Sequence, residues 1–448
     1  MLPGPLKIIL RRAGPSRWMP FAALALAVLI PEVACAQYTL ERVVLVSRHG
    51  VRAPTNTHPP LAEVASQSWP TWLVASPGDL TPRGEALAAL MGEYYRQHFA
   101  ALGLQSANGC PGQNEVYVWA DVDQRTRHTG NGLLAGAFPG CGLYAQHLQP
   151  TNQIDPLFHP VGFGVCAVDK DRARAEILQA AGGSLEQALR QQPYSDALKK
   201  LQAVLGCCAP KLCQAPGGTC TLEQVQSSIV EKGNSVGLSG PIPIGSTAAE
   251  IFLLEYAQNM PQHDVAWGRA STQADIVSLM WLHSLQFDLI ERTHHLARRQ
   301  GSALLHQVSE TLRQTAERTS TPQDRVPPES KLVIYVGHDT NLANIGGMLR
   351  VDWQLQSYLR NETPPAGAMA FELLRHNQSG KPFVRMSYYS QSPDQMRSAT
   401  RLSPTQPPDR AEIVPRCRNS QDGACPWQEF QDWVRQSVDP DCTLPTRR

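Results

Sequence analysis

The stretch VVLVSRHGVRAPT, residues 43–55, begins with four consecutive apolar residues and ends in a short basic loop. A strand that is apolar on both faces is what a sheet covered by helices on both sides requires. In open α/β sheets, ligands bind at the carboxyl ends of the strands. The stretch therefore predicts a buried parallel strand whose polar loop, from Arg48 to Arg52, lies at the ligand-binding edge of a sheet.

Two further segments have the same pattern. EVYVWA, residues 115–120, is followed by Asp121-Val122-Asp123, and LVIYV, residues 332–336, is followed by Gly337-His338-Asp339. Because the carboxyl ends of parallel strands meet at one edge of a sheet, we expect the three polar segments to lie close together. The sequence thus predicts one site built from three distant parts of the chain.

Helical patterns lie between and around these strands. The spacing of apolar residues predicts helices from Thr81 to about Leu102, over residues 246–260 and over residues 271–299. Thr81 is suited to the N-cap of the first of these helices, and Pro82 to its first turn. Residues 368–374 and 383–389 resemble strands of an antiparallel edge. The fold class expected is α/β: a mixed, mainly parallel sheet flanked by helices.

The middle of the chain differs from this pattern. Residues 168–245 have weak strand signals, alternate between helix-like and loop-like sequence, and contain four cysteines. We therefore expect an inserted smaller helical domain at residues 168–291. The α/β domain would consist of residues 37–167 and 292–448, after a signal peptide at residues 1–36.

The N-terminus has the pattern of a secretory signal. Four basic residues precede an apolar block of 12 residues from Met19 to Ile30, and Ala34-Cys35-Ala36 offers a small-residue cleavage site. The block is shorter than the about 20 apolar residues that span a bilayer. We therefore expect a periplasmic or secreted mature protein that starts at Gln37 and has no stable membrane association.

Composition agrees with export and restricts the partners. The chain has 448 residues and a formal charge of +1, which argues against a nucleic-acid-coating surface. Of the 11 cysteines, ten remain without Cys35, and an even number in an exported chain predicts disulfides. No cysteine pair has the C-x-x-C spacing of zinc or redox sites. The neighbours Cys207 and Cys208 are not assigned a partner by this argument.

The loop Arg48-His49-Gly50-Val51-Arg52 combines the parts of a phosphate site. Two arginines beside His49 disfavour its cationic form, which keeps the imidazole neutral and nucleophilic. The planar guanidinium group matches two phosphate oxygens at once, and Gly50 lets the backbone turn sharply and approach an anion. The alternative is a basic turn paired with acidic neighbours.

The other two strand ends supply complementary groups. His338 can donate hydrogen bonds to a phosphoryl group, and Asp339 can protonate a leaving alkoxide. Arg125 or Arg127 can complete the cluster around the phosphate. For the other of these two arginines, a salt bridge to Asp121 or Asp123 at a helix start is the expected arrangement.

The motifs RHGVRAPT at 48–55 and GHDTNLAN at 337–344 resemble those of the histidine acid phosphatase family, in particular its bacterial periplasmic acid phosphatase/phytase branch. The likeness covers most of the mature chain. It extends to WPTW at 69–72, LTPRGE at 80–85, GCPG at 109–112, ADVDQRTR at 120–127, EIFLLEYAQ at 250–258 and the final cysteines.

The resemblance implies a two-step hydrolysis of phosphate monoesters without a metal or a cofactor. His49 would attack phosphorus, Asp339 would protonate the leaving group, and water would then hydrolyse the phosphohistidine. The phosphate would be held by Arg48, Arg52, Arg125 and His338. Four disulfides are implied, Cys110–Cys141, Cys166–Cys442, Cys213–Cys220 and Cys417–Cys425, which leaves Cys207 and Cys208 as additions of this chain.

Phytate, myo-inositol hexakisphosphate, is the substrate favoured by the resemblance. The residues that would contact it are Thr55, Ser246, Thr247, Glu250, His283, Phe287 and Thr340; ordinary helix packing is the alternative for His283 and Phe287. Two positions depart from the branch. Asn56 stands where many bacterial phytases have Lys, and Gln300 replaces an arginine, although Arg298 or Arg299 could substitute for it. Losing two cations should weaken the binding of a polyanion.

Two alternatives remain. A glucose-1-phosphatase or a broad sugar-phosphate phosphatase of the same family is favoured by GAFPGC at 136–141 and DVAWG at 264–268, whereas Gly50 and Thr340 argue against it. A non-catalytic periplasmic protein that binds phosphorylated ligands belongs to a different class, and the presence of both His49 and Asp339 argues against it. In each case the expected partner is a small phosphorylated molecule and the expected state is a monomer.

Overall fold

The structure is a computed structural model of the chain, and it describes residues 37–214 and 218–444 together with Met1 and Gly4. The predicted signal peptide therefore lies outside the described residues, apart from those two. Within the described part of the chain, no helix is both long enough and apolar enough to cross a membrane.

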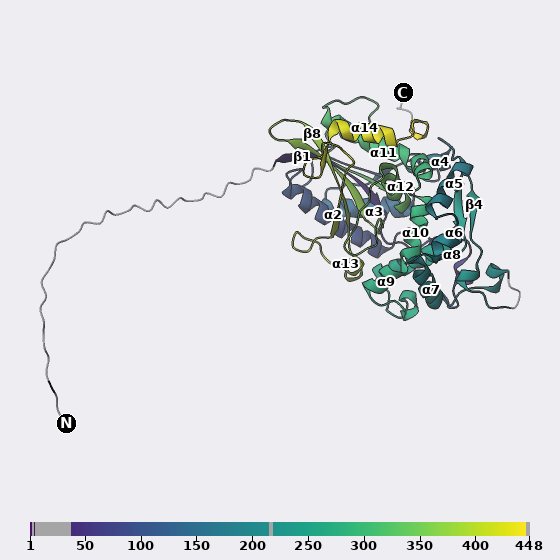
Figure 1. Cartoon of the computed structure of the whole chain (residues 1–448). Coiled ribbons are helices and arrows are strands. Elements are labelled where there is room, and N and C mark those ends of the chain that lie inside the picture. Colours follow the sequence, from purple (N-terminus) through teal and green to yellow (C-terminus); the bar gives the residue numbers. More distant parts are fainter. Residues whose placement is uncertain (2–3, 5–36, 215–217, 445–448) are drawn as a thin grey trace, which may run out of the picture. The chain divides into compact units, whose positions relative to one another are not determined.

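A mixed sheet forms the centre of the fold (Figure 1). Its strands run in the order β10-β8-β7-β1-β6-β2-β3, and β9 pairs with β8. The neighbours β1, β6, β2 and β3 are parallel, whereas β7 to β10 add an antiparallel half. The bounds are β1 Tyr38–Arg48, β2 Val116–Ala120, β3 Gln146–His147, β6 Leu332–Gly337, β7 Ala368–His376, β8 Pro382–Ser390, β9 Asp409–Ile413 and β10 Ala424–Pro426. The five strands expected from the sequence are all present.

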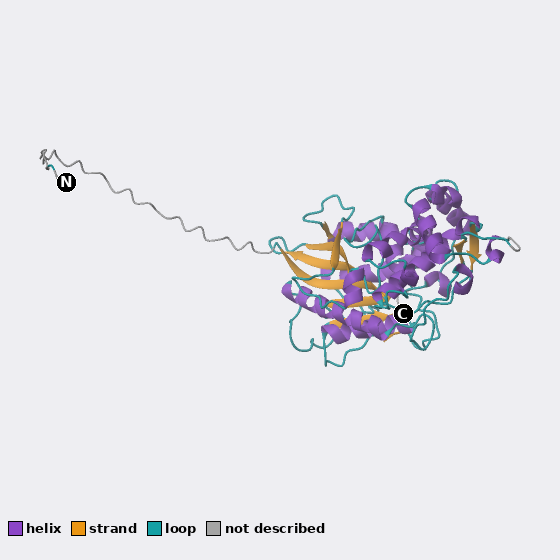
Figure 2. Ribbon diagram, turned by 90° about the horizontal axis from the view of Figure 1, so that it is seen from below, coloured by secondary structure: helices purple, strands orange, loops and turns teal. Residues whose placement is uncertain are grey.

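Helices cover both faces of this sheet, as Figure 2 shows. Val43 and Leu45 of β1 pack in a core with α2 and α3, whereas Val44 and Val46 face a second core with α11, α12 and α14. All four side chains are fully buried. Burial on both faces explains why this strand is a continuous apolar run instead of an alternating one. The fold class predicted from the sequence is confirmed.

The helices have these bounds: α1 Leu61–Val64, α2 Pro82–Ala101, α3 Gln124–Ala137, α4 Pro160–Phe163, α5 Lys170–Ala180, α6 Leu185–Arg190, α7 Tyr194–Leu205, α8 Pro241–Ala257, α9 Gln273–Leu279, α10 Trp281–Ile290, α11 His294–Ala316, α12 Asp339–Leu349, α13 Pro393–Ser398 and α14 Trp427–Ser437. Thr81 caps α2 as predicted, because its side chain accepts a hydrogen bond from the Gly84 amide. The expected helix over 271–299 is instead three helices, α9, α10 and the start of α11, because the backbone turns at Met280 and becomes extended at Thr293.

A third core lies among α5 to α10, around buried side chains such as Ile177, Leu201 and Phe252. The region is mainly helical as expected, but it also holds a two-stranded hairpin, β4 Ser228–Lys232 and β5 Ser235–Ser239, which the sequence analysis missed. From Gln37 onward the chain forms one compact unit. The boundaries at residues 168 and 291 therefore stay a prediction.

Five disulfides join cysteines of the described part of the chain. Four are the pairs that the family resemblance implies, Cys110–Cys141, Cys166–Cys442, Cys213–Cys220 and Cys417–Cys425. The fifth joins the neighbours Cys207 and Cys208, which the sequence analysis left without a partner. Cys166–Cys442 is the bridge with the largest sequence separation, 276 residues, and it ties the C-terminal segment to the loop before α5.

A buried carboxyl group on α8 should make stability depend on pH. Glu255 accepts a hydrogen bond from the Ala266 amide at 2.9 Å, yet burial raises its pKa to about 8. The folded state therefore keeps a proton that the unfolded chain loses near its ordinary pKa of about 4.3, so this contribution to stability is full in acid and is lost as pH rises toward 8.

We expect Glu255→Gln to remove this dependence. Between about pH 5 and about pH 8, the wild type should lose roughly 1–3 kcal/mol of unfolding free energy relative to the variant. Urea unfolding at both pH values measures the difference, with exposed Glu223→Gln as the control. An identical pH slope for the wild type and Glu255→Gln would contradict the assignment.

Candidate active site

The three polar strand ends meet at one edge of the sheet, as the sequence predicted. The His49 amide donates to the Gly337 carbonyl at 3.0 Å, and the Asp121 amide donates to the Val336 carbonyl at 2.9 Å. These bonds continue the parallel ladders that place β6 between β1 and β2. The loops after β1, β2 and β6 are therefore fixed against one another by the backbone.

The loop after β1 is held against α2 and α3. The Gly50 amide donates to the Thr129 hydroxyl at 2.8 Å. A side chain at Gly50 would lie 2.9 Å from the Gly84 carbonyl, and one at Gly84 would lie 2.1 Å from the Val51 carbonyl. Both glycines are therefore needed for the close approach of this loop to the start of α2.

His49 is buried, and its hydrogen bond fixes the tautomer. Its Nδ1 lies 2.9 Å from the Gly50 carbonyl, which can only accept, so Nδ1 carries the hydrogen and Nε2 keeps a lone pair. Burial holds the pKa of His49 well below its usual value, and the charges of Arg48, Arg125 and Arg52 lower it further. His49 therefore stays a neutral imidazole to well below its usual pKa, with Nε2 available for bond formation.

Two arginines share a carboxylate beside this imidazole. Arg48 contacts Glu250 and Asp339, the latter at 2.9 Å, and donates to the Thr363 carbonyl at 2.7 Å. Arg52 lies 3.2 Å from the second oxygen of Glu250. One oxygen of Glu250 thus contacts the guanidinium group of Arg48, and the other contacts that of Arg52. Two oxygens of a bound phosphate group could occupy the same two positions. A phosphate that binds these arginines competes with Glu250.

Asp339 opens α12 next to these charges. Burial raises its pKa, but the positive charges of Arg48 and Arg52, with those of His283 and His338, outweigh that effect and lower it to about 2. An anion that neutralises the arginines removes most of this effect. The carboxyl group would then take up a proton more readily when a phosphate group is bound.

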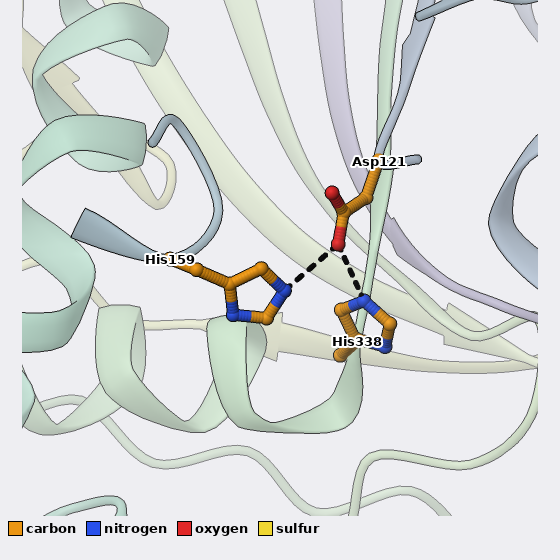
Figure 3. A group of neighbouring side chains, drawn as sticks. All are labelled: Asp121, His159 and His338. Atoms are coloured by element: carbon orange, nitrogen blue, oxygen red, sulfur yellow. Dashed lines mark hydrogen bonds and ion pairs between the residues drawn. The ribbon is translucent and has the colours of Figure 1, made fainter. Parts of the chain in front are cut away.

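His338 is oriented by an acid from the neighbouring strand end (Figure 3). Its Nε2 lies 2.7 Å from Asp121 Oδ2, and the same oxygen contacts His159 Nε2 at 2.8 Å. The His338 ring centroid is 5.6 Å from that of His49. Burial lowers the pKa of His338 more than Asp121 raises it, so this pKa is below its usual value. For His159 the effect of Asp121 exceeds that of burial, so its pKa is raised.

The two candidate arginines of α3 have different positions. Arg125 lies 3.5 Å from His338 Nδ1, and it also forms an ion pair of 2.5 Å with Asp123. Arg127 instead donates to the Val122 carbonyl at 3.0 Å. Arg125 is therefore the one that reaches the cluster, and it retains the helix-start salt bridge that was expected of the other arginine.

The residues expected to contact substrate are only partly gathered. His283 Nδ1 lies 3.1 Å from the Ser246 hydroxyl, and its ring packs on Phe287. His283 and Phe287 line a small pocket together with Glu362 and Thr363, whose carbonyl accepts a hydrogen bond from Arg48. Through Thr363 this pocket adjoins the arginine pair.

The remaining expected contacts, Thr55, Thr247 and Thr340, do not line this pocket. Thr55 is exposed, and Gly78 lies between its methyl group and the Arg125 guanidinium. Thr247 and Thr340 are half-buried, one on α8 and one in the first turn of α12.

Arg298 and Arg299, proposed as substitutes at position 300, are instead engaged by the C-terminal segment. Arg298 donates to the carbonyls of Ser437 and Val438, and Arg299 contacts Cys442 and Asp439. The structure does not bring them to the arginine pair, because these contacts hold both guanidinium groups against α14 and the chain end. Neither replaces the cation that Gln300 lacks.

Sequence reasoning missed three residues of this cluster. Asp121 was treated only as a partner for an arginine, although a buried acid directly after a strand was a usable signal. Thr129 lies inside a helix, and no motif marks it. His159 does not follow a strand, so nothing in the local sequence distinguishes His159 either. Their positions depend on how the loops pack.

Comparison with known proteins agrees with this architecture. The sequence pattern of the histidine phosphatase superfamily (branch 2) matches residues 39–389. The chain is 37% identical to phytase AppA of Escherichia coli strain K12, with 95% of this chain and 99% of the relative covered. It is 28% identical to a glucose-1-phosphatase of Salmonella typhimurium strain LT2, over 92% and 96% of the two chains. Among solved structures, Hafnia alvei phytase in complex with tartrate is 42% identical, has a TM-score of 0.83, and is covered over 100% of its chain and 92% of this one.

Proposed function

Because the chain belongs to the histidine phosphatase superfamily (branch 2) and is a hydrolase of phosphate monoesters, we propose that it works through a phosphohistidine on His49. The observation that carries this proposal is the tautomer of His49. Its Nδ1–H bond to the Gly50 carbonyl leaves Nε2 as the only ring atom with a free lone pair. Burial and the neighbouring arginines keep that atom unprotonated.

The first step transfers the phosphoryl group to His49. Nε2 forms a bond to phosphorus while the ester P–O bond breaks. Arg48, Arg52 and Arg125 bind the equatorial oxygens, whose charge is spread in the transition state. His338 binds one of these oxygens from Nδ1 in its protonated form, which the bound phosphate favours, while Nε2 stays on Asp121. Asp339 gives its proton to the departing oxygen, so an alcohol leaves instead of an alkoxide.

The second step reverses these roles. The Asp339 carboxylate accepts a proton from a water molecule, whose oxygen attacks phosphorus on the side that the alcohol left. The P–N bond breaks, inorganic phosphate is released, and Asp339 is again protonated. Over the two steps one water molecule is consumed for each ester, and no redox partner is required.

Phytate is the substrate that we propose within this class. The similarity to enzymes named phytases is greater than that to a glucose-1-phosphatase. The exposed position of Thr55, near Arg125, also leaves space at the edge of the site for a substrate larger than the reacting phosphate. Glucose 1-phosphate and other sugar phosphates remain the alternative.

A comparison of kcat/KM for phytate, glucose 1-phosphate and glycerol phosphate tests the substrate proposal. We expect phytate to exceed glucose 1-phosphate by about tenfold or more at acid pH with a chelator present, because it brings several anionic groups to a cationic site. A preference for glucose 1-phosphate would support the alternative and overturn the phytate assignment.

Asn56→Lys should strengthen the binding of phytate. Asn56 is exposed and follows Thr55 at the rim of the site, so an added cation gains about 0.2–1 kcal/mol per exposed charge pair. The KM for phytate should fall up to about fivefold in low salt, and the KM for glucose 1-phosphate should change less. Asn56→Gln is the matched neutral control. Equal changes for both substrates, or for both variants, would remove charge as the cause.

We also propose that the mature protein is exported. Five disulfides among the described residues suit an oxidising compartment, where such bonds persist. The signal pattern at residues 1–36 supports the same conclusion. Expression with and without these residues, followed by fractionation, tests it: a protein that stays in the cytoplasm with the segment intact would contradict export.

A further inference from the structure

One cluster at the edge of the site has a composition that phosphoryl transfer does not require. Asp121 Oδ2 is shared between His338 Nε2 at 2.7 Å and His159 Nε2 at 2.8 Å, and the three donor atoms all lie within 4.8 Å of one another. Figure 3 shows both imidazole rings pointing at the single carboxylate oxygen. Orienting His338 needs only one of these contacts, so His159 is left without a role in the reaction.

We propose that Asp121, His159 and His338 bind one divalent transition-metal ion such as Zn²⁺, and that its binding reversibly inhibits the enzyme. Two imidazole nitrogens and one carboxylate oxygen form a ligand set typical of zinc sites that keep a fourth position open. Mg²⁺ and Ca²⁺ prefer sets made of oxygen atoms, so this cluster selects against them.

The geometry needs only small adjustments to hold such an ion. Bonds of about 2.0–2.2 Å in a tetrahedral arrangement separate the ligand atoms by roughly 3.3 Å. The present nitrogen–oxygen distances of 2.7 and 2.8 Å must lengthen by about 0.5 Å. The two imidazole nitrogens, which lie within 4.8 Å of each other, must also approach to about 3.3 Å, so both rings have to rotate toward a common centre. The His159 side chain is 40% exposed, whereas Asp121 is 1% exposed, so the ion would enter from the His159 side.

The ion would be an inhibitor and not a cofactor, because it occupies the atoms that orient a phosphate contact. With Nε2 bound to a metal, His338 is no longer held by the Asp121 hydrogen bond. The open position of the ion would bind a phosphate oxygen and slow its release. This inhibitory role rests on the proposed function; the binding of the metal does not.

The direct test is calorimetric titration of the whole mature protein with Zn²⁺, together with the visible absorption of bound Co²⁺. The wild type should bind one ion tightly, with the strong visible band of a tetrahedral Co²⁺ site, and Mg²⁺ should produce no comparable heat. His159→Gln and His159→Asn should each weaken Zn²⁺ binding on the order of 100-fold or more and abolish the band. Both replacements can still donate an amide hydrogen to Asp121.

The matched control is His263→Asn. His263 is 82% exposed and lies 3.6 Å from Asp264, so it is a surface histidine–carboxylate pair outside the cluster. Wild-type affinity in both His159 variants, or an equal loss in His263→Asn, would overturn the proposed site. Thermal unfolding of each variant without metal shows whether it is folded. Two replacements of His159 are used so that the test still works if one of them does not fold.

Turnover of p-nitrophenyl phosphate, which has no polyanion to chelate the ion, tests the inhibition separately. Wild-type activity should fall in proportion to Zn²⁺ occupancy and return with a chelator, while each His159 variant keeps its own metal-free rate at that concentration. Full activity with the site occupied would overturn the inhibitory role. Heat and Co²⁺ absorption require no turnover, so they remain informative even if the proposed phosphatase mechanism fails.

Discussion

His49→Ala should reduce phosphate release from p-nitrophenyl phosphate by about 10⁴-fold or more, because it removes the atom proposed to form the bond to phosphorus. The arginines and His338 would still bind the ester, so we expect KM to change little compared with kcat. A direct attack by water would remain as the only route. Steady-state kinetics at acid pH with a chelator present measure both constants.

Two controls separate chemistry from folding. His49 is 2% exposed, so its truncation leaves a cavity and some loss of stability is expected. Thermal unfolding must show that the variant is folded at the assay temperature. Exposed His263→Ala should keep nearly all of the wild-type activity. A folded His49→Ala enzyme with more than about a tenth of wild-type kcat would rule out the nucleophile assignment.

Asp339→Asn should have the second-largest effect, and its size should depend on the leaving group. An alkyl ester such as glycerol phosphate must release a strongly basic oxygen, so losing the acid should cost about 10²–10⁴-fold in kcat. p-Nitrophenolate leaves without protonation, so its ester should lose less than about tenfold. The asparagine keeps the shape of Asp339 and can still accept a hydrogen bond from Arg48.

The leaving-group dependence distinguishes an acid from a structural residue. A plot of log kcat against leaving-group pKa should be shallow for the wild type and steep for Asp339→Asn. Asp171→Asn, the same change at an exposed position in the first turn of α5, serves as the control. Parallel plots for Asp339→Asn and the wild type would exclude Asp339 as the proton donor.

The low pKa of Asp339 in the free site has a consequence for pH dependence. At about 2 this pKa leaves little of the acid form at moderate pH, so protonation must accompany binding of the phosphate, whose charge offsets Arg48 and Arg52. Activity should therefore fall as pH rises and the complex loses this proton. His49 does not limit activity on the acid side until well below its usual pKa.

The sheet was predictable because it follows from local pattern. A strand buried on both faces must be apolar throughout, and the runs around Val44, Val118 and Ile334 have no other simple interpretation. Their polar ends converge because parallel strands end at the same edge. The hairpin β4–β5 was not predictable in this way, since its strands are short and only Val236 among their residues is buried.

The chemistry of the site was predictable only in part. His49 and His338 stand directly after strands, so topology alone brought them together. Glu250 was expected near the substrate only from the family resemblance, and His159 was not expected at all. They reach the site from a helix and a loop of other regions, through packing that no local pattern encodes. The proposed reacting groups were therefore expected from the sequence. The Asp121 oxygen shared by His159 and His338 was found only in the structure.

The most direct test of the phosphohistidine is to identify where the phosphoryl group is during turnover. Rapid quenching in alkali, which preserves phosphohistidine, followed by peptide mass spectrometry should find the group on Nε2 of His49 with p-nitrophenyl phosphate as substrate. The phosphorylated peptide should appear before steady state and disappear as the substrate is consumed. A burst of p-nitrophenol with the phosphoryl group on another residue, or turnover with inversion of configuration at phosphorus, would contradict a two-step reaction through His49.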